Sequence, residues 1–516
     1  MKTIKAISAA VSVIWLVLLF LWSFMTLEGV CRSGKAVRSS ATNLVESIHA
    51  DMLACCWHKD DLVVVNGGWT RILGKRRCNG VCRLKGRGRL FGTMPRRLPD
   101  AEVAKRCRAI VGLRDFVGRW GGRLLYLQPP YGLDMGKTML PYGISPEGVC
   151  GDDNASRLVG MCREKGVSVL DLRAWMSSTP AEVESSFYMT DHHWRIEAVF
   201  AVFPKILDKM RELGVVGEGA VWDESEWRYV FRPGFFLGTL GRRTGRLFSG
   251  VDDFGYYETE TGSMSMVVPS HRYIAKGPFN DVVVFKKHLH GDVSTGNRSA
   301  VYMGENVPLV VLRNPSAKVG KKVLVMKDSY ARPVLAFLST IFREVHAIDP
   351  RLYKSDVLEY AAGTRPDCVL ICYNPVSVSN KSAFWFDFGR LKSVPDLSRA
   401  EKVACGLEVK VSGGASEWAN KRLSAGLVAD SWYRVSFRMD ASPDVVGATV
   451  GVYDDKLRRC TNASIFPNEG PGELNEWVFR TGANPAKLAL YAGVAGKTAG
   501  KSVRYSDVCV EKVAAD

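Results

Sequence analysis

The central part of the chain alternates between short apolar runs and longer segments with helical periodicity. The apolar runs predict buried strands, and the amphipathic segments between them predict helices. The predicted strands are 123–127, 167–171, 322–326, 344–348 and 367–372, and the predicted helices are 101–120, 155–165, 197–213 and 333–342. Buried strands that alternate with helices form a parallel sheet that is covered on both faces. We therefore predict an α/β domain over residues 31–392, with an insertion at 225–315 near the site.

Beyond residue 393 the helical periodicity disappears. Short runs of alternating apolar and polar residues follow one another, separated by Gly, Asn, Asp and Pro. These runs are 407–411, 432–437, 448–453, 476–479, 487–491 and 502–505. The pattern predicts an antiparallel β-sandwich over residues 393–516. Cys405 and Cys509 lie near its two ends and are candidates for a disulfide that closes it.

The N-terminus carries an uncharged apolar stretch long enough to cross a bilayer. It lies between Lys5 and Glu28, and a helix of this length spans about 33 Å, enough for a hydrocarbon core of ~30 Å. The apolar core of a cleavable signal peptide is shorter, and Phe24 and Met25 stand where small residues would precede a cleavage site. We expect residues 1–30 to form a signal anchor that leaves the globular body exported. A cleaved signal peptide is the alternative.

The chain between the anchor and the first long helix is less regular. Helical periodicity at 32–60 predicts a juxtamembrane helix, residues 62–65 read as a short strand, and Asn66-Gly67-Gly68 reads as a turn. The 13 cysteines are an odd number, so at least one is unpaired or pairs between chains. Cys78 and Cys82, with Cys55, Cys56 and His58 upstream, allow either disulfides or a zinc site, and export favours disulfides.

Composition excludes a disordered chain, because 47% of the residues are hydrophobic. Lys and Arg number 70 against 53 Asp and Glu, which gives a net charge of +17. The segment from Arg71 to Arg97 is basic, rich in glycine and free of acidic residues. It is either a solvated loop or a contact for a polyanion, such as an acidic polysaccharide or anionic lipid headgroups. We expect no nucleic-acid partner, because no nucleic-acid motif accompanies the charge.

A first chemical motif lies where a buried strand meets a helix, at Met326-Lys327-Asp328-Ser329-Tyr330. Ligands of open α/β sheets bind beyond the carboxyl ends of the strands, so Ser329 is a candidate nucleophile. The backbone N–H groups of Ser329 and Tyr330 are candidate donors to an oxyanion at the helix start. The alternative is that Asp328 or Ser329 only caps the helix.

The second motif, Asp191-His192-His193-Trp194, directly precedes a predicted helix. A carboxylate two residues from an imidazole can fix its tautomer and stabilise the imidazolium when the ring takes a proton. His193 is the better candidate base, with Asp191 as its orienting acid, because the adjacent His192 would point elsewhere. The alternative is a helix start capped by Asp191.

Together the two motifs resemble the SGNH-hydrolase-like domain of the alginate O-acetyltransferase family. The resemblance runs loosely over residues 60–390 and includes Gly67-Gly68-Trp69 and Gln128-Pro129-Pro130. It implies Ser329 as nucleophile, His193 as base and Asp191 as orienting acid, with no cofactor and no metal. It also implies a polysaccharide acceptor and a membrane-bound O-acyltransferase as acetyl donor. The terminal β-sandwich resembles the carbohydrate-binding module of some members.

The chain departs from this family at two places. Members often have a small residue at the position of Lys327. Members also usually end the late strand with an acidic residue and an arginine, and this chain has Tyr373-Asn374-Pro375 there. Four residues near the motifs are expected to contact substrate, namely Tyr373, Asn374, Trp194 and Arg332. The sandwich offers aromatic candidates for sugar stacking, with core packing as the alternative for each. They are Trp418, Trp432, Tyr433, Tyr453, Trp477 and Tyr491.

The function that these features predict is O-acetyl transfer to a secreted or cell-surface polysaccharide through an acetyl-serine. Two alternatives stay open. The first is a polysaccharide acetylesterase with the same triad, because water or a sugar hydroxyl can each accept the acetyl group. The second is a non-catalytic, membrane-anchored polysaccharide-binding protein in which the three residues are structural.

Overall fold

The structure is a computed structural model. It describes residues 59–84, 88–92, 97–132, 151–175, 185–384, 386, 388, 393–414, 419–454, 459–494 and 497–515. Within these ranges no helix is both long and apolar enough to span a bilayer. The expected signal anchor lies outside the described residues, as do Cys55, Cys56, His58 and Trp418.

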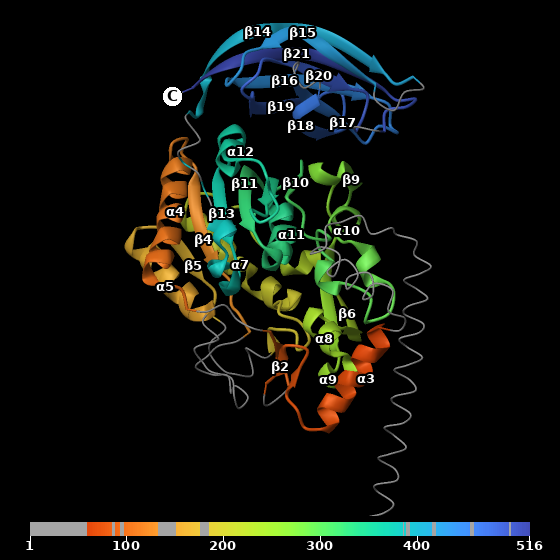
Figure 1. Cartoon of the computed structure of the whole chain (residues 1–516). Coiled ribbons are helices and arrows are strands. Elements are labelled where there is room, and N and C mark those ends of the chain that lie inside the picture. The colour runs from red at the N-terminus through yellow and green to blue at the C-terminus, as the bar shows by residue number, and fades with distance from the viewer. Residues whose placement is uncertain are drawn as a thin grey trace, which may run out of the picture.

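An eight-stranded sheet with the order β5-β4-β13-β11-β12-β10-β8-β9 forms the centre of the α/β part (Figure 1). Its parallel strands are β5 (Ser168–Asp171), β4 (Arg123–Gln128), β13 (Cys368–Cys372), β11 (Val319–Lys327) and β12 (Phe342–Ile348). Its antiparallel strands are β10 (Leu309–Arg313), β8 (Met264–Val268) and β9 (Tyr273–Gly277). The predicted parallel sheet is therefore confirmed. The insertion adds an antiparallel edge that its mixed composition did not reveal.

Helices cover both faces of this sheet because the strands are apolar on both sides. In β11, Val323 and Val325 pack on one face, and Leu324 and Met326 pack on the other. The first face carries α7 (Ile196–Glu212) and α11 (Arg332–Ile341), and the second carries α4 (Asp100–Gly118), α5 (Gly151–Glu164) and α12 (Val357–Thr364). Smaller elements complete this part: β1 (Arg77–Cys78), β2 (Val81–Arg83), β3 (Leu90–Phe91), β6 (Trp227–Phe236), β7 (Asp252–Thr259) and α10 (Phe279–Val282).

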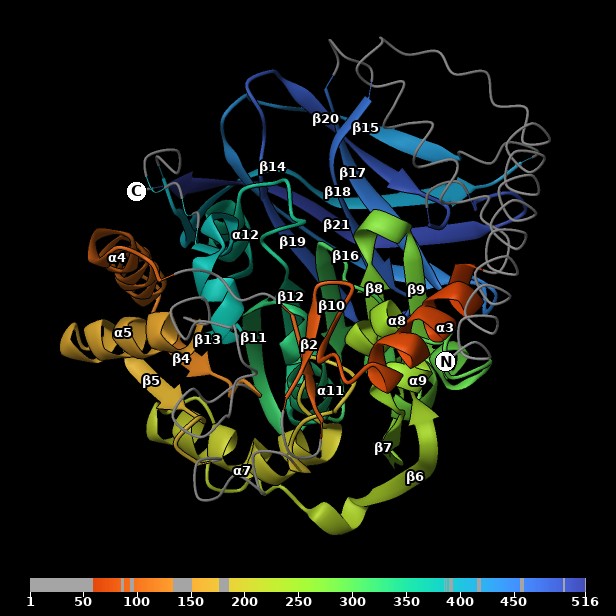
Figure 2. The ribbon, with the colours of Figure 1, turned by 60° about the horizontal axis from the view of Figure 1, so that its bottom comes forward.

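The predicted strand at 62–65 and turn at Asn66-Gly67-Gly68 are wrong, because these residues belong to the helix α3 (Lys59–Ile72). Figure 2 shows α3 beside α8 (Thr239–Thr244) and α9 (Arg246–Ser249). A Cβ atom on Gly67 would lie 1.9 Å from the carbonyl oxygen of Thr244. The glycine therefore serves close packing between helices, whereas sequence alone suggests a turn.

The C-terminal part consists of two antiparallel four-stranded sheets that pack face to face. One sheet holds β14 (Pro395–Ser412), β21 (Ser502–Ala515), β16 (Trp432–Ala441) and β19 (Leu474–Arg480). The other holds β15 (Asn420–Leu427), β20 (Ala486–Tyr491), β17 (Gly447–Asp454) and β18 (Arg459–Pro467). The predicted disulfide between Cys405 and Cys509 is confirmed. The strands β15 and β18 were not predicted, because they are polar edge strands of the second sheet.

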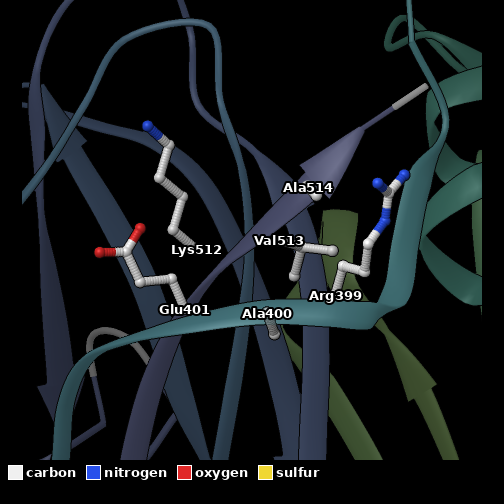
Figure 3. Close-up of a pocket in the computed structure, with 6 residues that line it drawn as sticks. All are labelled: Arg399, Ala400, Glu401, Lys512, Val513 and Ala514. Atoms are coloured by element: carbon white, nitrogen blue, oxygen red, sulfur yellow. The ribbon is translucent and has the colours of Figure 1, made fainter.

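An open pocket lies where β14 and β21 pair (Figure 3). Its lining residues are Arg399, Ala400, Glu401, Lys512, Val513 and Ala514. Glu401 and Lys512 are register partners on the two strands. No aromatic side chain lines this pocket, so it lacks the stacking surface expected of a sugar site.

The sandwich is packed against the α/β part at two places. Trp432 and Val513 share an apolar cluster with Leu358 and Ala361 of α12, and Trp432 is only 2% exposed. Gly363 at the end of α12 lies so close to β19 that a Cβ atom there would be 2.7 Å from the Val478 carbonyl oxygen.

The second contact packs Val267 and Val311 of the main sheet against Ile465 and Val494 of the sandwich. Beside it, Nζ of Lys276 donates to the carbonyl oxygen of Asn468 at 2.6 Å. These contacts correct the expectation that Trp432 is a sugar contact. Its ring is an anchor between the two parts.

Trp432→Ala is therefore expected to lower the free energy of unfolding by about 3–5 kcal/mol, as removal of a buried aromatic ring does. Leu474→Ala is the matched control, because Leu474 is 57% exposed on β19, and its change should stay within about 0.5 kcal/mol. Chemical denaturation followed by circular dichroism measures both. A Trp432→Ala variant within about 1 kcal/mol of wild type would contradict the anchoring role.

Candidate active site

The two sequence motifs meet because both follow the carboxyl ends of parallel strands. β11 ends at Lys327 and leads into the 3-10 turn Ser329–Ala331 and then α11. β5 ends at Asp171, and the chain returns to the sheet through α7, which begins at Ile196. Carboxyl ends of parallel strands lie at one edge of the sheet, so the residues before α7 and α11 come together there.

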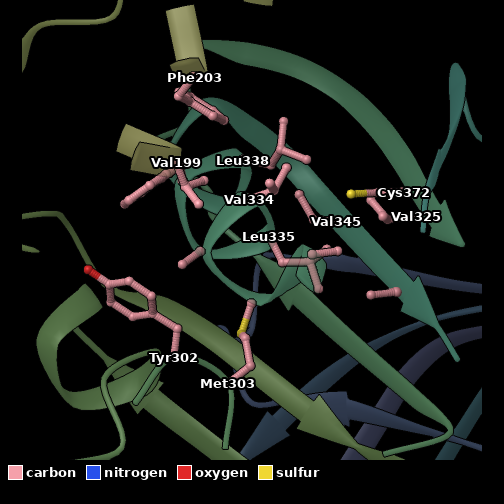
Figure 4. Packing of buried hydrophobic residues seen from close by; sticks show 14 of the residues in the cluster. Val199, Phe203, Tyr302, Met303, Val325, Val334, Leu335, Leu338, Val345 and Cys372 are labelled. Carbon is pink, nitrogen blue, oxygen red and sulfur yellow. The ribbon is translucent and has the colours of Figure 1, made fainter. Parts of the chain in front are cut away.

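The starts of these two helices are fixed by packing beneath them. Figure 4 shows Val199 and Phe203 of α7 beside Val334 and Leu338 of α11 in one apolar cluster. Each of these side chains is fully buried. Because densely packed side chains hold helices in fixed positions, the residues at the helix starts are held as well.

Ser329, His193 and Asp191 form a continuous chain of polar contacts. Nε2 of His193 lies 2.9 Å from Oγ of Ser329, and Nδ1 of His193 lies 2.5 Å from Oδ1 of Asp191. A proton on Nδ1 faces the carboxylate, which leaves Nε2 free to accept the serine proton. Asp191 is 2% exposed and His193 is 8% exposed, whereas Ser329 remains partly open to solvent. This arrangement can generate a serine nucleophile.

The Asp191 carboxylate is held ionised by its neighbours. Burial alone raises the pKa of this carboxyl, but the imidazoles of His193 and His192 and the hydrogen bonds from His193 and Thr239 hold its pKa far below the usual range. Its Oδ2 accepts from the backbone N–H of Thr239 at 2.6 Å, at the first residue of α8. Its Oδ1 also accepts from the backbone N–H of His193 at 3.0 Å. A negative charge therefore lies behind the imidazole.

A second buried carboxylate, Asp252 on β7, positions the loop that carries Asp191 and His193. Its Oδ1 accepts from the N–H of Met189 at 2.7 Å, and its Oδ2 accepts from the N–H and the hydroxyl of Thr190 at 2.8 and 2.6 Å. Burial raises the pKa of Asp252, and the hydrogen bonds from Thr190 and Met189 oppose that rise. Sequence reasoning missed Asp252, because it lies in the insertion and no local motif marks it.

A third buried carboxylate, Asp328, caps the turn at Ser329. Its Oδ1 accepts from the N–H of Tyr330 at 2.8 Å. Its Oδ2 accepts from the N–H and side-chain amide of Asn374 and from the hydroxyl of Ser377, which ties the ends of β11 and β13 together. The Tyr330 N–H is thereby occupied, so the expectation that it donates to an oxyanion does not hold. The Ser329 N–H has no partner among the described residues and remains the backbone candidate.

Two of the residues expected to contact substrate, Trp194 and Arg332, bind protein groups instead, and Trp194 joins the two loops. Nε1 of Trp194 donates to the carbonyl oxygen of Tyr330 at 3.0 Å, and the Tyr330 hydroxyl donates to the carbonyl oxygen of His192. Trp194 is only 2% exposed. Arg332 is also buried, and its Nη1 donates to the carbonyl oxygen of Ser299 at 3.2 Å. Trp194 and Arg332 therefore support the site from within the protein.

Tyr373 and Asn374 do not meet the same expectation either. Tyr373 is buried, and its hydroxyl donates to the carbonyl oxygen of Ala383 at 2.9 Å. The side-chain amide of Asn374 donates to Asp328, and its oxygen accepts from the N–H of Val376 at 2.8 Å. Both side chains are bonded within the protein, so neither is available to substrate.

Lys327, the departure from the family pattern, is a buried amine rather than a surface group. It is 3% exposed, and its Nζ donates to Oδ1 of Asn306 at 3.4 Å. Burial lowers the pKa of Lys327 to about 8, and the neighbouring Asp349 partly opposes this shift.

His192 differs from its neighbour in both contacts and charge. Its Nδ1 lies 3.4 Å from Oδ1 of Asp191, and the ring is partly exposed. Burial and the nearby His193 lower the pKa of His192 to about 4, so it is neutral at pH 7. The ligand atoms of Asp191, His192 and His193 lie within 4.8 Å of one another, a spacing that suits a metal ion. However, both nitrogens of His193 already face protein groups in this arrangement.

A small pocket opens beside Asp191 and His192. Its lining residues are Leu84, Arg89, Leu90, Phe91, Tyr131, Gly132, Phe187, Asp191, His192 and Leu240. Arg89 is 7% exposed, lies 5.6 Å from the centroid of the Phe187 ring and donates to the carbonyl oxygen of Gly132 at 2.5 Å. The described basic residues between Arg71 and Arg97 therefore differ in their surroundings. Arg89 supports the pocket wall, whereas Lys75, Arg76 and Arg77 are exposed.

Cys78 and Cys82 are both free thiols buried in the β1–β3 hairpin. Cys78 packs with Val81 and Leu90 and accepts a hydrogen bond from the amide of Asn66 at 3.7 Å. The other cysteines and the histidine of the alternative zinc site lie outside the described residues.

Comparison with known proteins finds no matching family model and no matching curated protein. Among solved structures, the chain is similar to PatB1 of Bacillus cereus, with 18% identity, a TM-score of 0.50, and coverage of 60% of this chain and 100% of that one. It is also similar to a DHHW family protein of Eubacterium siraeum (17% identity, TM-score 0.45, 60% and 94% covered). A third match is AlgX of Pseudomonas aeruginosa (12% identity, TM-score 0.35, 84% and 94% covered). At these identities the likeness to PatB1 shows the fold of the α/β part.

The support that Asp252 gives to the triad loop is testable. Asp252→Asn replaces one acceptor oxygen with a donor that faces an N–H group, so His193 should move out of line with Ser329. We expect labelling of Ser329 by a serine-directed phosphonate to slow by about 10–100-fold, because a misplacement of ~1 Å is enough for this loss. The exposed neighbour provides the control, and Asp253→Asn should label within about twofold of wild type. Equal labelling of both variants would show that Asp252 does not position His193.

Proposed function

We propose that this protein is a serine-dependent O-acetyltransferase that acts on a secreted or cell-surface polysaccharide. The observation that carries the proposal is the contact chain Ser329–His193–Asp191, with separations of 2.9 and 2.5 Å. A serine hydroxyl is a weak nucleophile until a base takes its proton, and an oriented imidazole backed by a buried carboxylate is such a base. The acetyl group is inferred from the sequence resemblance to the alginate O-acetyltransferase family.

In the first half-reaction, Oγ of Ser329 attacks the carbonyl carbon of the acetyl donor while its proton passes to Nε2 of His193. The Ser329 N–H, at the start of a helical turn, is the proposed donor to the oxyanion that develops. The tetrahedral intermediate then expels the donor's leaving group, which takes the proton from His193. The product of this step is an acetyl-serine and a neutral imidazole.

In the second half-reaction, Nε2 of His193 accepts the proton of an acceptor hydroxyl. The hydroxyl oxygen attacks the acetyl carbonyl, and Oγ of Ser329 leaves and takes the proton back. If water occupies the position of the acceptor, the same steps make the protein an esterase. The ionised Asp191 stabilises the imidazolium in both halves, because its charge lies against Nδ1.

The proposal includes an exported body, anchored through the N-terminal apolar stretch, and a membrane-bound O-acyltransferase as the source of acetyl groups. The uncharged stretch between Lys5 and Glu28 supports the anchor, and the family resemblance supports the donor.

The triad is tested by three alanine variants assayed with a chromogenic acetyl ester. Ser329→Ala should abolish turnover, since loss of the nucleophile of such a unit lowers kcat by a factor on the order of 10⁶. His193→Ala should match it, because the base and nucleophile act as one unit. His192→Ala should be much milder, because its ring is not in contact with Ser329. Activity of Ser329→Ala within about tenfold of wild type would refute the assignment.

The same assay, run with and without an oligosaccharide acceptor, separates the alternatives. A transferase forms acetylated oligosaccharide and releases the chromophore faster when acceptor is present, whereas an esterase releases acetate at a rate that the acceptor does not change. A folded protein that neither turns over the ester nor labels at Ser329 would be a binding protein.

For the sandwich, we propose that the outer face of the second sheet contacts the polymer. The Arg422 guanidinium lies 4.4 Å from the centroid of the Tyr453 ring, and the Tyr453 hydroxyl is hydrogen-bonded to that of Tyr491. A Cβ atom on Gly451 would lie 2.9 Å from Sγ of Cys460, so the glycine makes room for the Cys460 side chain on the neighbouring strand. Tyr453 is partly exposed, whereas Tyr433 and Tyr491 are buried.

Tyr453→Ala should weaken retention of the polysaccharide in affinity electrophoresis by about three- to tenfold, the equivalent of ~0.5–1.5 kcal/mol for an aromatic contact. Turnover of the small acetyl ester should not change. Trp477→Ala is the control, because Trp477 is also partly exposed but lies on the other sheet. If Trp477→Ala loses retention and Tyr453→Ala keeps it, the polymer binds near β19 at the edge of the first sheet and not on the outer face of the second.

A further inference from the structure

The helix α3 presents four of its apolar residues to solvent, whereas Val63, Val64 and its two glycines lie toward the protein. Gly67 is buried against the carbonyl oxygen of Thr244, and a Cβ atom on Gly245 would lie 2.5 Å from Cα of Val64. Close approach through glycines fixes the helix with little burial of side chains. An ordinary surface helix of a globular protein buries its apolar stripe, so this orientation is the reverse of the usual one.

The outward stripe is formed by Leu62, Val65, Trp69 and Ile72, which recur at helical spacing. They are 39%, 44%, 47% and 74% exposed. Two further residues extend the stripe, Leu73 at 64% and Leu247 of the adjoining α9 at 52%. Single exposed apolar residues are common, but a contiguous patch with a tryptophan marks an interaction surface. We call these six residues the α3 face.

Positive charge borders the C-terminal end and the α8–α9 side of the α3 face, whereas Asp60 and Asp61 lie at its N-terminal end. Arg71 is part of α3 itself, and its Nη1 donates to the carbonyl oxygen of Leu247 at 3.2 Å. Other exposed basic residues follow α3 or lie on α8 and α9: Lys75, Arg76, Arg77, Arg243 and Arg246. The described residues 62–84 and 239–250 contain no Asp or Glu. An apolar strip with a tryptophan and a basic border has the chemistry of a surface that enters an anionic lipid interface.

We propose that the α3 face docks onto the surface of an anionic phospholipid bilayer. Trp69, Ile72 and Leu73 enter the boundary between headgroups and acyl chains, and the basic border contacts lipid phosphates. The position of α3 in the chain supports this occupant, because α3 begins at Lys59, about thirty residues after the apolar stretch that ends before Glu28. A tether of this length can bring the face to the bilayer in any backbone conformation, because even a helix rises ~1.5 Å per residue.

Docking through α3 also orients the rest of the molecule. Figure 1 shows α3, α9 and β2 at the end of the protein opposite the β-sandwich. α3 packs against α8, whose first N–H group, that of Thr239, donates to Asp191. Docking would therefore turn the edge of the sheet that carries Ser329 and His193 toward the bilayer, and the sandwich away from it. This placement of donor and acceptor sides rests on the proposed acetyl transfer, whereas the docking itself rests only on the α3 face and the proposed N-terminal anchor.

The experiment uses the full chain in liposomes of phosphatidylethanolamine and phosphatidylglycerol. A photo-crosslinking residue is introduced as Ile72→p-benzoyl-phenylalanine or, as control, Leu474→p-benzoyl-phenylalanine. Leu474 is 57% exposed on the sandwich, so it shares the tether but lies at the far end of the molecule. After irradiation, mass spectrometry of the peptides identifies what each position has captured. We expect lipid adducts at position 72 to exceed those at position 474 by about tenfold or more.

Other captures at position 72 would overturn the proposal. Adducts with residues 1–58 of the same chain would show that this segment covers the face, and adducts with a second copy would show an interface between copies. Equal lipid capture at positions 72 and 474 would show tethering without docking. The charge component is tested by Lys75→Gln with Arg76→Gln and Arg77→Gln. This variant should capture several-fold less lipid, and unchanged capture would refute the role of anionic headgroups.

The result is independent of catalysis. Lipid capture at position 72 should be the same when Ser329→Ala is added, because docking requires no acetyl transfer. Failure of the triad and failure of the docking face are therefore distinguishable outcomes.

Discussion

The contact between Nε2 of His193 and Oγ of Ser329 is the interaction on which the rest of the site depends. The two residues are 136 positions apart in the chain and belong to loops that leave different strands. A separation of 2.9 Å between them requires the parallel sheet to bring both strand ends to one edge. It also requires α7 and α11 to hold their first residues in place. The bond from Trp194 to the Tyr330 carbonyl and the bond from Tyr330 to the His192 carbonyl then lock the two loops together.

Three buried carboxylates organise this edge, and they are stabilised in two different ways. Asp191 has imidazoles beside it, so its charge is favoured and available to His193. Asp252 and Asp328 instead accept hydrogen bonds from backbone and side-chain groups, while burial raises the pKa of each. A buried carboxylate is tolerated only when its lone pairs are satisfied, so these two residues fix the backbone around them. In the proposed mechanism one carboxylate assists the proton transfer, and the other two hold the loops on which the reacting residues lie.

The α/β part lies between two surfaces of different chemistry. The sandwich is attached through buried contacts at Trp432, Gly363 and Val311, which leaves the outer face around Tyr453 and Arg422 for a ligand. The α3 face at the other end is apolar and bordered by basic residues. The proposed transfer of a group from a membrane to a polymer would need two such surfaces, and the edge that carries His193 and Ser329 is connected to the α3 end through α8.

Sequence periodicity determined much of the fold, because the alternation of apolar residues is a local property of each strand and helix. The strands β4, β5, β11, β12 and β13, the helices α4, α5, α7 and α11 and the disulfide of the sandwich follow from such local patterns. Ser329, His193 and Asp191 were also recognisable, because each lies in a short motif at an element boundary.

Only the tertiary structure decided which partner each polar or aromatic group takes. It assigns the Tyr330 N–H to Asp328, and the side chains of Tyr373, Asn374 and Trp194 to the protein interior. It makes Trp432 an anchor between the two parts and Asp252 a support of the triad loop. It also shows that residues predicted as a strand and a turn belong to the helix α3. The reason is physical, because a hydrogen bond or a packing contact is settled by residues far away in the chain, and local sequence does not contain them.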